Sequence, residues 1–236
     1  MIKRVWLFEL GREVRISEPK KHFAAHADAY VRYISVFLYP QGCRAFFADV
    51  PWIGSHLRVL DAGCGTGIIT FALFEALGRR GVEIECVHGF DLTPAMLGRF
   101  RSGLRRRRIK GVNLHEADML KPDQLPATWT GYDLIVSASM LEYVPRDKFS
   151  EALASLRGRL SPGGRFLLFI TRRNWLTSVL VERPWGGARY SDQELATSFA
   201  AAGFAGLTFH RFPPRYGWLN LWGYIVEAHS PTGVSA

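Results

Sequence analysis

Three glycines at alternate positions, directly after an aspartate, are the residues whose types and spacing point most clearly to chemistry. Residues 57–67 read LRVLDAGCGTG, in which Asp61 is followed by Gly63, Gly65 and Gly67. Glycine has no Cβ, so the backbone can turn tightly and approach a ligand closely. The residues before Asp61 are typical of a buried parallel strand. After position 67, apolar residues recur at the spacing of a helix. This order of strand, glycine turn and helix predicts a nucleotide site at the carboxyl end of the strand.

The spacing of the glycines separates one class of nucleotide from another. A dinucleotide fingerprint requires G-x-G-x-x-G, whereas the spacing here is G-x-G-x-G and position 68 is Ile. Asp61 would repel a pyrophosphate, but it would suit the ammonium group of an amino-acid moiety. DAGCGTG resembles the first motif of the class I S-adenosylmethionine-dependent methyltransferases. The alternative is that the turn is only a tight connection.

Two further aspartates match later motifs of that family. Asp91 ends the second expected strand, where a carboxylate can accept hydrogen bonds from both hydroxyls of a ribose. Asp118, in EADML, matches the acid that meets the adenine amino group. Each also has a structural alternative, Asp91 as a helix cap and Asp118 as a turn residue. The resemblance implies a set of cofactor-binding residues: Asp61, Ala62, Gly63, Cys64, Gly65, Gly67, Asp91, Leu92, Met96, Ala117, Asp118, Met119 and Ser137.

An aromatic pattern near the N-terminus predicts a lid. Residues 22–40 carry apolar and aromatic side chains at helical intervals, and Phe23, Ala27 and Tyr30 resemble the lid helix of small-molecule methyltransferases. Tyr30 therefore joins the predicted cofactor-binding residues. The aspartate that usually follows this tyrosine is absent, since position 31 is Val. Plain helix packing is the alternative.

No catalytic residue is assigned, and no metal site is predicted. The family often shows a Glu-His pair after the fourth strand, but here Glu142 is followed by Tyr143. A general base is needed only if the acceptor is protonated at working pH. The chain has no H-E-x-x-H and no cysteine pair at zinc spacing. The Asn/Asp-Pro-Pro-aromatic motif of methyltransferases that act on DNA bases or glutamine is also missing, which argues against those acceptors.

The elements that must position these residues alternate between strands and helices. Strands are expected at 57–61, 83–90, 112–115, 132–137, 165–171, 204–212 and 221–229, and helices at 68–80, 145–160 and 191–202. The resemblance implies an α/β, Rossmann-like, doubly wound, seven-stranded, mainly parallel sheet with a reversed last strand and N-terminal lid helices. Residues 1–56 are expected to form the lid, with an edge strand at 3–10, and 57–236 the methyltransferase domain. A substrate-covering insert is expected at 172–190.

The acceptor is predicted from residues expected to border the cavity. Trp175, Trp185, Trp218 and Trp222 favour an apolar small molecule such as an isoprenoid, polyketide or lipid. The alternative is that they fill the interface between lid and sheet. An anionic head group could be met by four arginines of the expected insert, which are Arg172, Arg173, Arg183 and Arg189.

Composition leaves several other partners open. The formal charge is +9 and the pI about 9.8, and Arg105–Arg108 invite an RNA partner. A solvated helix end explains the cluster equally simply and is favoured, because no aromatic residue is interleaved with it. An RNA-directed methyltransferase, a non-catalytic cofactor-binding protein and a nicotinamide oxidoreductase are the alternatives, and a homodimer is left open. Three scattered cysteines, no signal peptide and no membrane-spanning run favour the cytoplasm.

Overall fold

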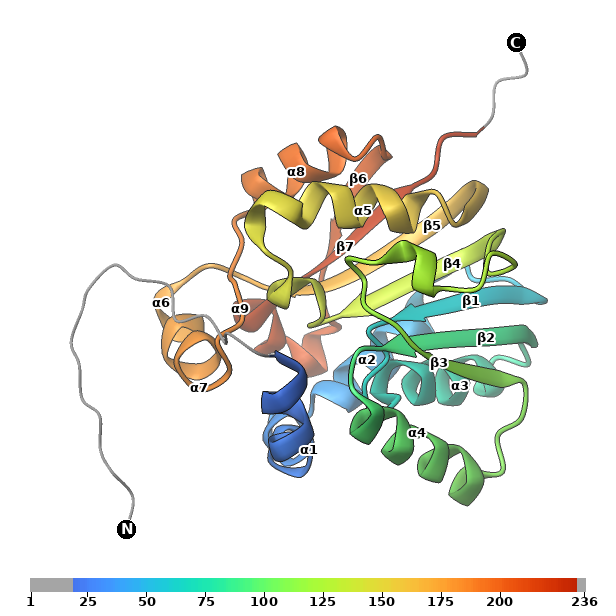
Figure 1. The fold of residues 1–236 in the computed structure, drawn as a ribbon, viewed down its shortest axis with the longest axis horizontal. Helices are drawn as coiled ribbons and strands as arrows, with labels where there is room; N and C mark the ends of the chain where they lie inside the picture. The colour runs from blue at the N-terminus through green and yellow to red at the C-terminus, as the bar shows by residue number, and fades with distance from the viewer. Residues whose placement is uncertain (1–18, 233–236) are drawn as a thin grey trace.

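A seven-stranded, mainly parallel β-sheet forms the centre of the fold, and helices cover both of its faces (Figure 1). The computed structural model describes residues 19–232. In space the strands follow the order β3-β2-β1-β4-β5-β7-β6, and β7 is antiparallel to both of its neighbours. The predicted α/β, Rossmann-like sheet with a reversed last strand is therefore confirmed. The strands are β1 (Leu57–Ala62), β2 (Ile84–Asp91), β3 (Val112–Glu116), β4 (Tyr132–Ala138), β5 (Leu160–Thr171), β6 (Ala205–His210) and β7 (Gly223–His229).

Two groups of helices bury the two faces of the sheet. On one face lie α2 (Tyr39–Asp49), α3 (Ile68–Arg79) and α4 (Pro94–Arg107), and on the other lie α5 (Phe149–Arg157) and α8 (Asp192–Ala201). Val59 and Leu60, neighbours on β1, are fully buried in different core clusters. Because a central parallel strand is covered on both sides, its sequence is continuously apolar rather than alternating.

The position of β1 brings the ends of three strands together. β1 pairs in parallel with β2 on one side and with β4 on the other, and Ala62 stands opposite both Phe90 and Ser137. The residues that follow these strands therefore emerge at the same edge of the sheet, on either side of the point where the strand order reverses. This is the edge at which open α/β sheets bind ligands.

The N-terminal helical region predicted around residues 22–40 consists of two helices. α1 (Pro19–Val36) is kinked at His26, and α2 begins at Tyr39 after Leu38, whose φ is 56°. Left-handed backbone at Leu38 ends the first helix, and Pro40 is suited to the first turn of the second. The missed signal is the spacing of Cys43, Phe46 and Phe47, which are all buried on α2.

The helix predicted over 145–160 is shorter than expected. Residues 146–148 form a 3₁₀ turn, α5 ends at Arg157, and Leu160 already belongs to β5. The expected turn at 161–164 lies within an irregular start of that strand, where the register with β4 shifts between Tyr132 and Leu134. Ser161 Oγ donates to the Tyr132 carbonyl at 3.0 Å, which ties this irregular segment to β4.

Residues 172–190 leave the sheet and return to it. They contain α6 (Trp175–Thr177), a π-helical turn (Ser178–Glu182) and α7 (Arg183–Trp185). At the base, the Tyr190 N–H donates to the Thr171 carbonyl at 3.1 Å, and the Arg173 N–H donates to the Tyr190 carbonyl at 2.7 Å. The helix predicted over 191–202 follows directly, and it begins with a capping box in which Ser191 and Glu194 bond each other's backbone N–H at the start of α8.

The remaining segments complete the description of the chain. A short helix, α9 (Leu219–Trp222), precedes β7, so β7 starts later than the strand predicted over 221–229. β6 is also shorter than the strand predicted over 204–212. The edge strand predicted at 3–10 lies outside the described residues. Within residues 19–232, no helix has the length and apolar character that crossing a bilayer requires.

Candidate functional site

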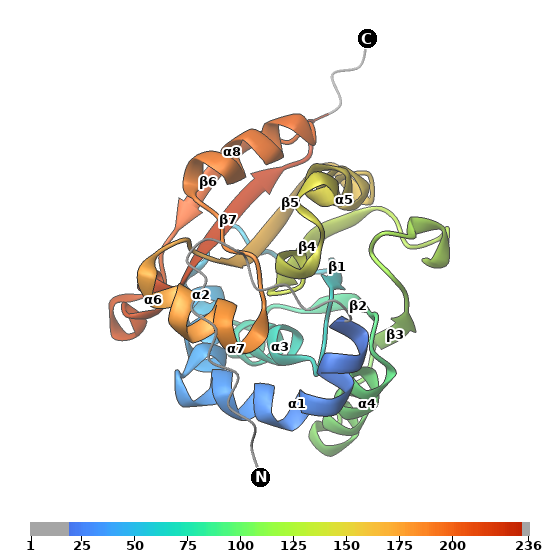
Figure 2. The same cartoon turned by 60° about the vertical axis from the view of Figure 1, so that its left-hand side comes forward.

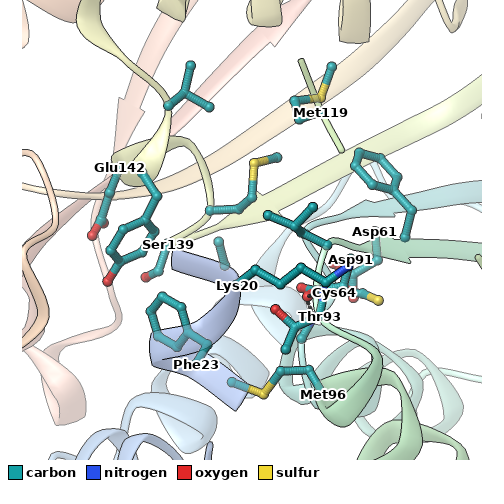
Figure 3. A pocket seen from close by; sticks show the side chains of 18 of the residues that line it. Lys20, Phe23, Asp61, Cys64, Asp91, Thr93, Met96, Met119, Ser139 and Glu142 are labelled. Carbon is teal, nitrogen blue, oxygen red and sulfur yellow. Dashed lines mark hydrogen bonds between the residues drawn. The ribbon is translucent and has the colours of Figure 1, made fainter. Parts of the chain in front are cut away.

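A cavity of about 430 Å³ opens at the carboxyl ends of β1, β2 and β4, where α1 approaches the sheet. Its walls come from the turns after β1, β2 and β3, the segment after β4, and one side of α1. Figure 3 shows Asp61 and Asp91 on one side of the cavity, Ser139, Glu142 and Phe23 on the opposite side, and the Lys20 side chain between them. The cavity therefore has one wall built by the glycine motif and another built by residues that follow β4.

The glycine turn contributes backbone to the cavity wall. Gly63 and Gly65 have φ angles of 72° and 52°, in the region that favours glycine. A Cβ at Gly63 would lie 2.2 Å from the Met140 Cβ, whereas a Cβ at Gly65 would meet nothing nearer than the Asp91 Oδ2 at 4.0 Å. Gly63 thus permits a close approach of two segments, and Gly65 leaves open space beside the backbone.

Cys64, between these glycines, is a buried thiol rather than a reactive one. Its side chain is buried, and burial raises the pKa of the thiol well above its ordinary value. A neutral, buried thiol is a poor nucleophile. Cys64 is therefore a small residue that fills the turn and lines the cavity.

Asp91 holds the glycine turn and the start of α4 at the same time. Its Oδ2 accepts from the Gly65 N–H at 2.9 Å, and its Oδ1 accepts from the Thr93 N–H at 2.8 Å. Burial raises the pKa of Asp91, and the two backbone donors oppose that shift. Asp91 is not itself the cap of α4, whose N-cap is Thr93, but its carboxylate fixes the backbone of that residue. The same carboxylate also lines the cavity.

Asp61 is a buried carboxyl at the floor of the cavity. It is 1% exposed, and its Oδ2 accepts from the Thr70 hydroxyl at 2.6 Å. Burial raises the pKa of Asp61 to about 7, although the hydrogen bond from Thr70 lowers it. A carboxyl in this environment gains most from a cationic partner, because such a partner offsets the cost of the buried charge.

The turn after β3 supplies an apolar wall and one aspartate. Ala117 and Met119 are buried, and both line the cavity together with Asp118. The Asp118 N–H donates to the Gln124 side chain at 2.9 Å, and the Asp118 Oδ1 accepts from the Leu120 N–H at 3.0 Å. Asp118 is therefore a turn residue whose carboxylate also reaches the cavity wall.

Helix α1 closes the cavity with aromatic side chains. Phe23 and Tyr30 line it, and the Phe23 ring lies 4.9 Å from the ring of Tyr143. Trp185, from the insert, packs behind them with its ring centroid 5.1 Å from that of Tyr30. Burial raises the pKa of the Tyr30 phenol, and the nearby Glu142 carboxylate raises it further. The phenol therefore stays protonated, and its side chain is hydrogen-bonded to Ser139.

Glu142 is the buried acid of the second wall. Its Oε1 accepts from both the N–H and the hydroxyl of Thr171, each at 2.7 Å. Burial raises the pKa of Glu142 to about 7, and the bonds from Thr171 oppose that shift. A carboxyl with this pKa exchanges a proton near neutral pH, which is the property that a general base needs.

Ser139 reaches the same wall through an uncommon backbone conformation. It follows β4 directly, its φ is 55°, and its N–H donates to the Phe169 carbonyl at 3.0 Å. Positive φ at a residue other than glycine costs energy and persists where the surrounding structure enforces it. No feature of the sequence marks Ser139 apart from its place after a strand.

Most residues that the sequence predicts for cofactor binding line this one cavity. They are Tyr30, Asp61, Gly63, Cys64, Gly65, Asp91, Leu92, Met96, Ala117, Asp118 and Met119. Among the described residues, Ala62, Gly67 and Ser137 are placed elsewhere. Ala62 and Ser137 are fully buried and joined by a hydrogen bond from the Ser137 hydroxyl to the Ala62 carbonyl, and Gly67 packs against Phe100. Lining residues that sequence reasoning missed include Lys20, Tyr39, Thr66, Ser139, Met140 and Ala188.

The four tryptophans predicted to border the cavity do not line it. Trp175 and Trp218 are exposed, Trp222 packs against Phe37, and Trp185 lies behind the rings of α1. None of the four arginines of the insert lines the cavity. Arg172 stacks on Tyr224, Arg173 pairs with Glu194, Arg189 pairs with Glu182, and Arg183 is exposed. The apolar wall is formed instead by residues of α1 and of the segment after β4. Within residues 19–232, no cluster of three His, Cys, Asp or Glu side chains is suited to a metal ion.

Comparison with known proteins finds a family match and several relatives for this chain. Residues 59–164 match the sequence model of a family described as a methyltransferase domain. Aklanonic acid methyltransferase DauC of Streptomyces sp. (strain C5) is 32% identical over 143 residues, which is 61% of this chain and 60% of that protein. A ubiquinone biosynthesis O-methyltransferase of Aeromonas salmonicida (strain A449) is 31% identical over 117 residues, 50% of this chain and 44% of the relative. The matches thus span about half the length of these two relatives.

Solved structures show the same fold. The crystal structure of magnesium protoporphyrin IX methyltransferase from Synechocystis PCC 6803 with bound SAH superposes with a TM-score of 0.66 at 17% identity, over 89% of this chain and 97% of that one. The matched residues 59–164 contain the glycine turn, Asp91 and Asp118, which are the residues that carry the motifs. Residues 59–164 therefore match a methyltransferase domain, and they carry the motifs of the class I S-adenosylmethionine-dependent family.

Proposed function

We propose that this protein transfers a methyl group from S-adenosylmethionine to a small organic acceptor of apolar or aromatic character. The observation that carries the proposal is that one cavity holds the strand-end carboxylates Asp61, Asp91 and Asp118 on one side and aromatic rings on the other. The names of the relatives, which mention aklanonic acid and ubiquinone, support an acceptor with a ring system.

The residues of the cavity fit S-adenosylmethionine. Open space beside Gly65 leaves room for a ligand against the backbone, and the buried Asp61 suits an ammonium group. The Asp91 carboxylate suits the ribose hydroxyls, and the apolar surface of Ala117 and Met119 suits the flat face of adenine. A cavity of about 430 Å³ lies within the size range of small-molecule sites.

The chain's own residues would then position the acceptor and exclude water. Bound S-adenosylmethionine supplies a methyl group that its sulfonium already activates for in-line displacement. Phe23 and Tyr143 close the cavity from the lid side, so that the acceptor is held in an environment with little water. Glu142 and the Tyr30 phenol are placed to receive or orient an acceptor hydroxyl.

We propose on this basis that residues 1–56 and 172–190 act as the lid and insert over the acceptor, with 57–236 as the catalytic domain.

Calorimetry with S-adenosylhomocysteine is the direct test of cofactor binding. The full chain is expected to bind it at one site, and a fluorescence titration with NADH is expected to show no binding. Methyl transfer is then measured with a labelled methyl donor and three acceptors: an aromatic polyketide acid, a polyprenylated phenol and a hydrophilic amine. Transfer is expected to one of the first two. Absence of S-adenosylhomocysteine binding, or saturable NADH binding, would contradict the proposal.

The arginine cluster supports an RNA acceptor only weakly. Arg105–Arg107 lie at the end of α4, and Arg108 caps it. This end is roughly 20 Å along the helix from the end that faces the cavity. Arg107 pairs with Glu75 at 2.6 Å and stacks on Phe71, which gives it a structural role. RNA binding that falls with salt and disappears when Arg105 and Arg106 are replaced by Ser would favour this second candidate.

Binding of S-adenosylhomocysteine is expected to strengthen as the pH rises through 7. Burial raises the pKa of free Asp61 to about 7, so at pH 6 the carboxyl is mostly protonated and must lose its proton to pair with an ammonium group. Calorimetry at pH 6 and pH 8, in buffers of different ionisation enthalpy, should show tighter binding at pH 8 and proton release on binding. The Asp61→Asn variant should lose this part of the pH dependence. Equal proton release by the variant would exclude Asp61 as its source.

A further inference from the structure

Six exposed apolar side chains gather on the outer side of the lid. They form a surface that we call the outer rim: Val36, Leu38, Trp175, Val179, Trp218 and Leu221. Trp175 is 79% exposed, Val36 76% and Leu221 59%. Isolated exposed apolar residues are ordinary on proteins, whereas a group that includes two tryptophans indicates an interaction surface.

Hydrogen bonds between the segments hold the outer rim together. The Trp218 Nε1 donates to the Phe37 carbonyl at 3.1 Å, which places Trp218 next to the residues that flank Phe37. The Asn174 amide donates to the Leu221 carbonyl at 2.7 Å, and the Tyr33 hydroxyl donates to the Leu180 carbonyl. These bonds bring the end of α1, the insert and α9 side by side. In Figure 1, α6, α7 and α9 lie together, and α7 lies beside α1 in Figure 2, where Trp185 packs against Tyr33.

The charge around the outer rim is strongly positive. Residues 172–190 and 211–222 contain six arginines and one acidic residue, Glu182. Glu182 is already paired with Arg189 at 2.6 Å. Arg183 and Arg215 are exposed, and so is Arg32, one helical turn before Val36. The apolar surface is thus bordered by cations that lack a matching set of acids in these segments.

We propose that the outer rim binds the surface of an anionic phospholipid bilayer. Tryptophan rings are suited to the head-group region of a bilayer, and arginine side chains can reach lipid phosphates while their stems stay in apolar surroundings. A second copy of the chain fits less well. A symmetric dimer through this surface would bring the same basic residues of both copies together.

A bilayer at this position would lie directly outside the acceptor cavity. Ring contacts lead from Trp222 to Tyr33 at 5.6 Å, from Tyr33 to Trp185 at 5.4 Å, and from Trp185 to Tyr30 at 5.1 Å. Tyr30 lines the cavity. A layer of packed aromatic rings therefore separates the outer rim from the cavity, so a bilayer-dissolved acceptor would lie close to the cavity and would enter it where these rings part. This consequence rests on the proposed function, whereas binding to the bilayer does not.

Sedimentation with lipid vesicles tests the proposal. The full chain is mixed with vesicles of phosphatidylcholine alone and of phosphatidylcholine with phosphatidylglycerol. We expect binding to the anionic vesicles that weakens with salt. The Trp175→Ser/Leu221→Ser and Arg183→Ser/Arg215→Ser variants are each expected to lower the partition coefficient by about tenfold. The matched control, Arg105→Ser/Arg106→Ser, removes two exposed arginines at the end of α4, away from the lid, and should bind as the unaltered chain does.

Three results would overturn the proposal. The first is that the full chain fails to sediment with anionic vesicles at low salt. The second is that the control loses as much binding as the rim variants, which would indicate general electrostatic attraction. The third is that light scattering shows a dimer that the Trp175→Ser/Leu221→Ser variant dissociates, since the outer rim would then be covered by a second copy. Thermal unfolding of each variant reports folding, and S-adenosylhomocysteine calorimetry reports cofactor binding, so a failure of the proposed function is recognised independently of vesicle binding.

Discussion

Replacing Asp91 by Ala is expected to weaken S-adenosylhomocysteine binding by about 100-fold or more. The proposed role gives this carboxylate two charge-assisted hydrogen bonds to the ribose, each of which contributes roughly 1.5–3 kcal/mol, and about 1.4 kcal/mol corresponds to a tenfold change. The variant also removes the acceptor of the Gly65 and Thr93 N–H groups, which lie 2.9 and 2.8 Å from it. The loss therefore affects both the ligand contact and the shape of the turn.

Two further variants separate these effects from a general loss of charge. Asp91→Asn keeps one acceptor oxygen of similar shape, so an intermediate loss of about tenfold is expected. Asp123→Ala removes an exposed carboxylate from the loop that follows β3, and binding should be unchanged. Isothermal calorimetry on all three variants, with thermal unfolding as a check of folding, gives the comparison. If Asp91→Ala bound as tightly as the unaltered chain, the proposed ribose contact would be wrong.

Replacing Gly67 by Ala is expected to lower the free energy of unfolding by about 2–5 kcal/mol. The φ of Gly67 is 86°, and an added Cβ would lie 2.2 Å from the Phe100 ring, which is fully buried. Left-handed backbone costs a residue with a Cβ roughly 1–2 kcal/mol, and overpacking of a core costs roughly 1–3 kcal/mol. The midpoint of thermal unfolding should fall by roughly 5–15 °C.

Gly65→Ala is the matched variant, because only the local space differs. Its φ is also positive, at 52°, but the added Cβ would have no neighbour closer than 4.0 Å. We expect this variant to lose roughly 1–2 kcal/mol of stability from the backbone alone, and to bind S-adenosylhomocysteine more weakly because the methyl group occupies open space in the turn. Differential scanning calorimetry distinguishes the two variants. Equal stability of Gly65→Ala and Gly67→Ala would show that contact with Phe100 is not the cause.

The central part of the fold could be predicted because its signals are local. Asp61 and Asp91 end short apolar strands, the three glycines stand between a strand and a helix, and Ser191 with Glu194 form a capping box. Each of these patterns depends only on neighbouring residues. The parallel pairing of β1 with β2 and β4 then brings the strand ends to one edge, so the predicted residues on those ends come together.

The other wall of the cavity depends on long-range packing and could not be predicted in the same way. Ser139 lines the cavity because its backbone turns at positive φ, whereas Ser137, two residues earlier, bonds to Ala62. Nothing in the order of residues 137–139 distinguishes these serines. The tryptophans of the insert were assigned to the cavity by composition, but the path of the insert places Trp175 on the surface. Tyr39 reaches the cavity only because the chain bends at Leu38.

The two ends of residues 172–190 are joined by hydrogen bonds, and this has a consequence for how the segment can vary in evolution. Hydrogen bonds from Tyr190 to Thr171 and from Arg173 to Tyr190 bring the two ends of the excursion together, so its length and composition put no constraint on the register of β5. An exchange of this segment for one from a related chain would leave the pairing of β5 with β4 and β7 as it is. If the proposed function holds, selection could therefore change the segment over the acceptor while the strands that end at Asp61 and Asp91 stay unchanged.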